Sequence, residues 1–341
     1  MKQISGFFFK GLISIGLISA LLYWKVDLKE LGQAFQQVDY LLYIVSTLLF
    51  FIQQGVIAWC WQIVLRAQDN QIPFKRILQV HWIGAFFGTF MPTSIGMDIV
   101  RAFSLKKYLR NGVHAMSSMF VTRVVGFVIN FAIALVVAIP VAQQTGNVRL
   151  FWTVLVMTVA FCGGIWLMLH PRLLKLFAPL FQRFKLDRIY QKLVEFQEGT
   201  KELRHAKSAM IKLLLLSLFF QIFGIIIIYL VGLSLGLDIA FQHYFIIIPL
   251  ITTITILPLS VAGIGVREGA FVFFLVPLGA TESQAFSLSL LVFAQWVGMA
   301  LTGGIVYWIS GMQISREKNR DINNSAAIEL ETDALKTKTL G

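Results

Sequence analysis

The apolar runs of this sequence are long enough to cross a lipid bilayer, and they decide what the chain can fold into. A helix needs about 20 apolar residues to span the hydrocarbon core. Within that core each backbone polar group must be hydrogen-bonded inside the protein, which leaves helices as the simplest solution. Six runs reach this length: 4–24, 41–65, 115–141, 150–169, 211–236 and 284–311. We therefore expect an all-α polytopic membrane protein with about six full spans.

Composition argues against a water-soluble protein. Of the 341 residues, 57% are hydrophobic and 13% are charged, whereas charged residues make up about 25% of an ordinary globular domain. A soluble fold of this composition would expose large apolar patches. The net charge of +12 suits cytoplasmic loops beside anionic lipid, so we expect membrane lipids and no nucleic acid as partners.

The basic residues between the runs orient the chain, because Lys and Arg collect in cytoplasmic loops. One cluster follows the second run and consists of Arg66, Lys75 and Arg76. The other precedes the third run and consists of Arg101, Lys106, Lys107 and Arg110. A single crossing by 77–100 would leave one cluster outside, whereas a re-entrant hairpin keeps both inside. The same rule places 170–212 inside and makes 242–280 begin and end outside, as a second hairpin or as two short spans.

Two other segments complete the domain organisation. The loop 170–212 has apolar residues at helical spacing with charges between them, which predicts an amphipathic helix on the cytoplasmic membrane surface. Residues 1–311 then form the membrane domain. The polar tail 312–341 is expected to be disordered and cytoplasmic, as is the N-terminus.

Two segments broken by Pro and Gly share a pattern. Residues 90–101 run FMPTSIGMDIVR and residues 257–268 run LPLSVAGIGVRE, each with Pro-x-Ser, then Gly, then charges. Two broken hairpins that enter from opposite faces are the arrangement of an inverted-repeat transporter. The match is short, so chance and ordinary helix packing stand as alternatives. The residues expected to break the helices are Pro92, Gly96, Pro258, Gly263 and Gly265, with Ser94 and Ser260 supplying hydroxyls.

Charged residues within apolar surroundings are candidate functional residues, since each costs at least about 2.5 kcal/mol at the centre of a membrane helix. They are Asp98, Arg101, Arg123, Arg267 and Glu268. Arg123 lies about two turns into the third run, and we expect Asp98 or Glu268 to be its partner. For Arg101, a place at the cytoplasmic interface is the alternative to a functional role.

The arginines suggest what these charges bind. A guanidinium suits phosphate, so Arg101, Arg123 and Arg267 are candidates for holding a lipid phosphate; purely structural ion pairs are the alternative. Arg267 and Glu268 are adjacent in the sequence, so their side chains diverge by about 100° on a helix, and we expect each to serve a different neighbour.

The other polar residues point to no further chemistry. His81 and the glutamines within apolar runs are expected to form interhelical hydrogen bonds; these glutamines are Gln53, Gln54, Gln221 and Gln295. The five histidines have no ligand spacing, and Cys60 and Cys162 lie inside apolar runs. No phosphate-binding glycine loop is found. We therefore expect neither a metal nor a cofactor.

Three motifs resemble the transmembrane domain of the lysylphosphatidylglycerol synthase family. They lie at 91–102, 121–126 and 257–270, and the most specific is G-x-G-x-R-E-G, beginning at Gly263. The resemblance covers roughly 5–311 and implies a bacterial inner-membrane protein that moves or handles lipids, with all five charges at family positions. The chain departs from the family's glycine-rich run before the aspartate, having TSIGM at 93–97.

Three functions compete at this point. The first is a flippase-like translocase for an anionic or phosphate-bearing lipid. The second is a partner that recruits a lipid or glycan synthase without transporting anything, and the third is an enzyme acting on a lipid-linked substrate within the membrane. Full-length synthases of the family add a soluble domain that transfers an amino acid from tRNA. The stretch after the last run is too short for such a domain, so we expect no aminoacyl transfer.

Overall fold

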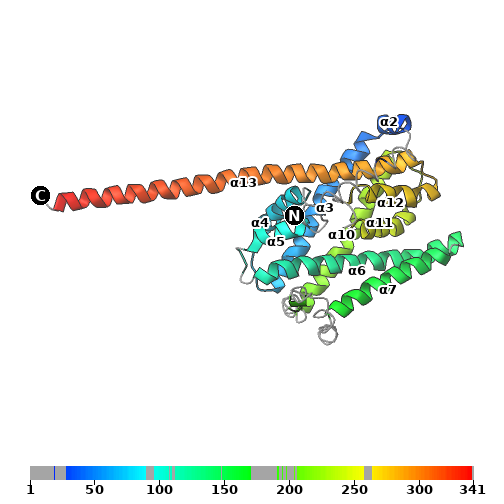
Figure 1. The fold of residues 1–341 in the computed structure, drawn as a ribbon, viewed down its shortest axis with the longest axis horizontal. Helices are drawn as coiled ribbons and strands as arrows, with labels where there is room; N and C mark the ends of the chain where they lie inside the picture. Colours follow the sequence, from blue (N-terminus) through cyan, green and yellow to red (C-terminus); the bar gives the residue numbers. More distant parts are fainter. Residues whose placement is uncertain are drawn as a thin grey trace.

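A computed structural model describes residues 28–89, 96–106, 108–109, 112–146, 148–169, 206–256 and 263–339, with single positions at 19, 190, 191, 194, 197 and 203. Every regular element within these residues is helical (Figure 1). The first predicted span, 4–24, lies outside the described residues apart from Ser19, as does nearly all of the predicted amphipathic loop, whose last residues form the start of α10.

Four helices of the described chain are long and apolar enough to cross a membrane. They are α3 (Tyr40–Ala67), α6 (Gly112–Thr145), α10 (Lys207–Ser234) and the Glu282–Ser310 part of α13 (Glu282–Thr339). Each overlaps a predicted span. A fifth helix, α7 (Val148–Leu169), covers the predicted run 150–169. The chain is therefore an integral membrane protein.

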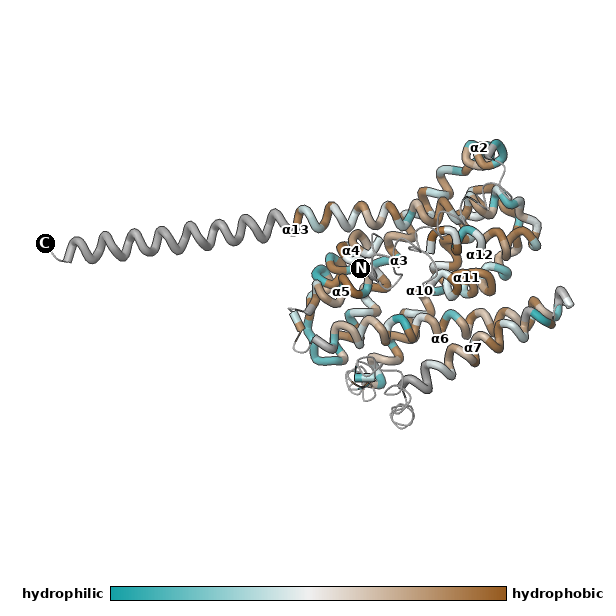
Figure 2. Tube along the Cα trace, in the orientation of Figure 1, coloured by the Kyte–Doolittle hydropathy of each residue, from teal (hydrophilic) through white to brown (hydrophobic). Residues whose placement is uncertain are grey.

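The long helices are largely apolar along their length (Figure 2), and large apolar side chains are exposed on them. Leu48 of α3, Val136 of α6 and Leu215 of α10 expose 61%, 68% and 63% of their surface. Such a surface would be unfavourable in water, but it matches the hydrocarbon of a bilayer. The same helices turn polar residues such as Gln54 and Ser217 inward, where both are buried.

Both broken segments are pairs of short helices. The first pair is α4 (Phe74–Thr89) and α5 (Gly96–Lys106), and the second is α11 (Phe241–Ile256) and α12 (Val266–Leu275). The helices of each pair pack side by side. With 16 residues α4 is about 24 Å long, less than the hydrocarbon thickness of about 30 Å. None of these helices spans the core alone.

The glycines of the second break have a conformation that other residues rarely adopt. Gly263 has φ +76° and Gly265, the N-cap of α12, has φ +86°, in the region that glycine enters without steric cost. Gly96 begins α5. The other predicted break residues, Pro92 and Pro258, lie outside the described residues, as do Ser94 and Ser260.

The two pairs begin at opposite ends of the bundle (Figure 1). The N–H of Asp39, just before α3, donates to the carbonyl of Ser234 at the end of α10 (2.8 Å), so α3 and α10 run antiparallel. The second pair follows the end of α10, whereas the first follows the end of α3. The guanidinium of Arg76, near the start of α4, lies 5.1 Å from the Tyr108 ring beyond α5, so the first pair returns to the end from which it started.

Helix α13 continues past the membrane domain. We expected disorder after 311, whereas α13 is assigned as helix to Thr339. Residues 312–339 contain neither Pro nor Gly, the two residues that most strongly end a helix.

Glycine lets α13 lie close against α4. A Cβ on Gly303 would sit 2.0 Å from the backbone carbonyl oxygen of Trp82, and one on Gly304 would sit 3.0 Å from the Phe86 ring. Small residues of this kind allow membrane helices to approach closely where hydrophobic burial supplies no driving force. The α4–α13 contact therefore depends on glycine.

We expect Gly303→Ala to lower the free energy of unfolding by about 1–3 kcal/mol, because the added methyl group has no space. The matched control is Gly163→Ala in α7, where a Cβ would meet nothing within 4 Å; there the better helix propensity of Ala should raise stability slightly. Thermal unfolding in detergent measures both. A midpoint for Gly303→Ala equal to that of the parent protein would contradict the close contact.

Candidate functional site

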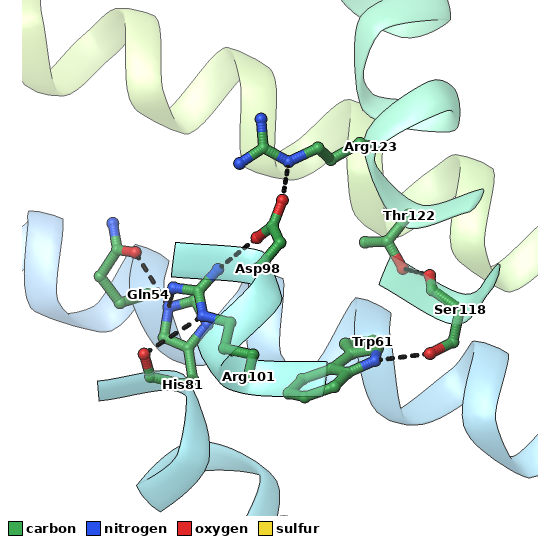
Figure 3. Close-up of polar contacts among 8 residues, drawn as sticks. All are labelled: Gln54, Trp61, His81, Asp98, Arg101, Ser118, Thr122 and Arg123. Carbon is green, nitrogen blue, oxygen red and sulfur yellow. Dashed lines mark hydrogen bonds and ion pairs between the residues drawn. The ribbon is translucent and has the colours of Figure 1, made fainter. Parts of the chain in front are cut away.

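Asp98 is the centre of a charge cluster between α5 and α6 (Figure 3). It lies in the first turn of α5, where the helix dipole favours a carboxylate. Arg101 follows one turn later, and its Nη1 lies 3.2 Å from Oδ1 of Asp98. Arg123 of α6 pairs through Nε with the other oxygen, Oδ2. Of the two partners expected for Arg123, the structure thus selects Asp98.

Arg101 extends the cluster to α4 and α3. Its Nε donates to the carbonyl of His81 (3.3 Å), and its Nη2 lies 3.4 Å from His81 Nε2, which is 3.2 Å from Oε1 of Gln54. Arg101 is only 6% exposed, because α5 packs along α4 and carries this side chain into the bundle.

Two glycines of α4 make this approach possible. A Cβ on Gly84 would lie 2.4 Å from Cγ of Arg101, and one on Gly88 would lie 2.6 Å from Cα of Met97. Gly84 and Gly88 form a G-x-x-x-G spacing that marks close helix contacts in membranes. The sequence carried this signal, but our reading of it missed these two residues.

Arg123 is the more accessible arginine of the cluster. Its side chain is 31% exposed, against 7% for Arg101. Within the part of the chain that the structure describes, the cluster holds two arginines and one carboxylate. The partly exposed guanidinium of Arg123 is of the kind that binds an anion through its fork of donors.

Arg267 and Glu268 form a second cluster, at the start of α12. They pair with each other through Nη2 of Arg267 and Oε1 of Glu268. Our expectation that each would pair with a different neighbour instead is therefore wrong. Glu268 folds back to cap its own helix, accepting the N–H of Gly265 at Oε2 (2.5 Å). This brings its carboxylate beside the neighbouring guanidinium in spite of the helical angle between them.

Helix α13 completes the second cluster. The hydroxyl of Ser289 donates to Oε1 of Glu268 (3.2 Å), and Nε of Arg267 donates to the same hydroxyl oxygen (3.1 Å). The Arg267 guanidinium also lies 4.6 Å from the Phe293 ring centroid. Glu268 is 1% exposed. The two charges match one to one, and the cluster holds α12 against α13. No local sequence signal pointed to Ser289 or Phe293.

The predicted interhelical hydrogen bonds of the glutamines are confirmed. Gln53 donates to the Phe220 carbonyl (2.9 Å), Gln221 to the Gly126 carbonyl (2.9 Å), and Gln295 to the Ser46 hydroxyl (3.0 Å). Asn130 of α6, which we did not single out, donates to the hydroxyl of Thr252 in α11 (3.0 Å). Within the described residues, no group of three or more His, Cys, Asp or Glu side chains could hold a metal ion.

Removing half of the second cluster should destabilise the protein strongly. We expect Glu268→Ala to cost about 3–5 kcal/mol, because it leaves the Arg267 charge buried without its carboxylate. Ser289→Ala should cost about 1 kcal/mol. The control is Ser287→Ala, since Ser287 bonds only the carbonyl of Ser283 within α13. Unfolding midpoints that show Ser289→Ala and Ser287→Ala to be equal would contradict the role of Ser289.

The comparison with known protein families agrees with both the fold and the motifs. The family described as the lysylphosphatidylglycerol synthase TM region matches residues 7–304, which include both charge clusters. No curated protein and no solved structure matches the chain. Since the family match covers most of its length, the chain belongs to the lysylphosphatidylglycerol synthase TM-region family.

Proposed function

We propose that this protein is a lipid translocase that binds the phosphate of a membrane lipid at Arg123. The observation that carries the proposal is the α5–α6 cluster, in which two arginines share one carboxylate and only Arg123 is partly exposed. The family, whose description names a lipid synthase, supports a role in lipid handling. The proposed location is a bacterial inner membrane with both termini cytoplasmic, and no chemical reaction is part of the proposed activity.

Exchange of partners at Arg123 would let the site take up a phosphate at low cost. In the empty protein Asp98 is shared by Arg101 and Arg123. In this exchange a phosphate oxygen takes the place of the carboxylate at Arg123. The guanidinium can bind either group, because its fork of N–H donors fits both. Asp98 keeps its contact with Arg101, so no carboxylate is left buried without a cation.

The second cluster has a different part in this proposal. Arg267 is matched by Glu268, and its side chain is 12% exposed, so it is a weaker candidate for the phosphate than Arg123. We assign it to positioning α12 on α13. The two broken helix pairs start from opposite ends of the bundle, which supports an inverted-repeat mechanism in which each pair closes the site from one side.

The first test replaces Arg123. We expect Arg123→Gln to slow transbilayer movement of fluorescent phosphatidylglycerol at least tenfold, since a hydrogen bond to a charged group contributes about 1.5–3 kcal/mol. Arg123→Lys should retain part of the rate, because the charge stays but the fork is lost. The assay uses vesicles containing the purified protein, with labelled phosphatidylcholine and an isoprenyl phosphate run in parallel to rank lipid classes.

The control for this test is Arg149→Gln, which removes an exposed arginine at the start of α7 and should leave the rate unchanged. Equal rates for Arg123→Gln and the parent protein would rule out Arg123 as the phosphate site. Movement by the parent protein no faster than in empty vesicles, with and without an ion gradient, would count against a translocase and favour a partner role.

The second test asks whether Asp98 competes with the phosphate. Asp98→Asn should lower the unfolding temperature, because two arginines lose their shared carboxylate. The same variant should show a larger upward shift on addition of dihexanoyl phosphatidylglycerol, since the competing carboxylate is gone. Thermal unfolding with and without this lipid measures both effects. A shift smaller than that of the parent protein would contradict competition at Arg123.

A further inference from the structure

An apolar groove opens between α6, α10 and α11. Its lining includes Ile129, Ala132 and Val136 from α6, Leu218 and Ile222 from α10, and Phe245 from α11, and its volume is about 290 Å³. Val136 and Leu218 are 68% and 37% exposed, so the groove opens on the face that meets the bilayer. All of its lining residues are apolar, and a cavity of this kind disfavours water.

The dimensions select among apolar occupants. The groove follows α6 from Ile129 to Val137, a rise of about 12 Å. Spread over that length, the volume corresponds to a cross-section of about 24 Å². An elongated apolar space of this kind suits part of one extended hydrocarbon chain.

The groove also lies at a suitable distance from the phosphate site. Ile129 is six residues beyond Arg123 on α6, a rise of about 9 Å. Between them, Gln221 of α10 bonds the carbonyl of Gly126 at 2.9 Å and holds α6 and α10 together where the groove begins. Helix α6 begins a few residues after α5, at the end of the bundle from which α4 starts. Lipids of the leaflet at that end of the bundle have their headgroups outermost and their chains toward the membrane centre. A lipid in this orientation with its phosphate at Arg123 would point its chain toward the groove.

We propose that this groove binds one hydrocarbon chain of the phosphate-bearing lipid whose headgroup Arg123 holds. The inference rests on the proposed function and adds a second recognition element to it. Chain and phosphate then bind at neighbouring levels of one helix. The protein should distinguish a phospholipid both from a soluble phosphate ester and from a lipid without phosphate.

The test maps contact with a photoreactive chain. Phosphatidylglycerol and diacylglycerol, each with a diazirine in the middle of its hydrocarbon chain, are placed in vesicles with the protein and irradiated. Mass spectrometry then identifies the protein residues to which each lipid has become attached. We expect phosphatidylglycerol to label 129–137 and 218–222 at least fivefold more strongly than other lipid-facing positions. Diacylglycerol should label these residues at least fivefold less, as should phosphatidylglycerol in Arg123→Gln.

Filling the groove supplies the matched variants. Ala132→Phe places a ring in the groove from an exposed position and should reduce its labelling at least fivefold; Val136→Phe is a second variant of the same kind. Ala160→Phe, at an exposed position of α7 outside the groove, is the control. Dihexanoyl phosphatidylglycerol, whose chains are short, should bind Ala132→Phe and the parent protein equally, which shows that the headgroup site is intact.

The outcomes separate the two proposals. Labelling spread evenly over the lipid-facing helices, or unchanged by Ala132→Phe, overturns the groove while leaving Arg123 as a phosphate site. Protein–protein crosslinks that block the groove also overturn it, in favour of a second copy. Groove labelling that is equal for diacylglycerol and phosphatidylglycerol overturns the link between the groove and Arg123, whereas the phosphate site itself fails only if Arg123→Gln leaves lipid movement unchanged.

Discussion

A buried carboxylate shared by two guanidinium groups is the interaction on which the cytoplasmic half of the proposed topology depends. A lone charge within a membrane bundle costs several kcal/mol, so Asp98, Arg101 and Arg123 are stable only together. Asp98 and Arg101 lie on α5, a helix too short to span, while Arg123 lies on a full span. Their pairing therefore requires α5 to fold back into the bundle. The glycines of α4 that face Arg101 and Met97 leave the space for it.

The two charge clusters use similar residues for different purposes because their stoichiometry differs. At α12, one arginine meets one carboxylate, a serine and an aromatic ring, and the carboxylate also caps its helix. Such a set is satisfied internally and suits a fixed joint. At α5, two arginines share one carboxylate and one of them is a third exposed. The exposed part of Arg123 can be reached by an anion from outside the cluster, which is why the proposal concentrates on this residue.

Between these clusters the helices are held together by hydrogen bonds and close packing, which stabilise a bundle without the hydrophobic effect. Helices in lipid gain little from hydrophobic burial, since the surrounding chains are equally apolar. Here glutamines on α3, α10 and α13 bond the backbones or hydroxyls of neighbouring helices, and Gly303 brings α13 against α4. The groove between α6, α10 and α11 lies on the far side of the Gln221 bond from Arg123 along α6. The proposed lipid site is thus built on helices that a polar contact holds together.

The sequence by itself determined the membrane class, the positions of the long helices, the two broken segments and the five charges within apolar surroundings. Each of these follows from local properties: apolar length, Pro and Gly breaks, and the cost of a charge in an apolar run. The tertiary structure decided which charges pair. It joined Arg123 to Asp98, buried Arg101, and placed Ser289 and Phe293, more than 20 residues away, beside Glu268 and Arg267. Partner choice depends on how distant helices approach and how a carboxylate bends back to cap its own helix, and neither is encoded in local periodicity.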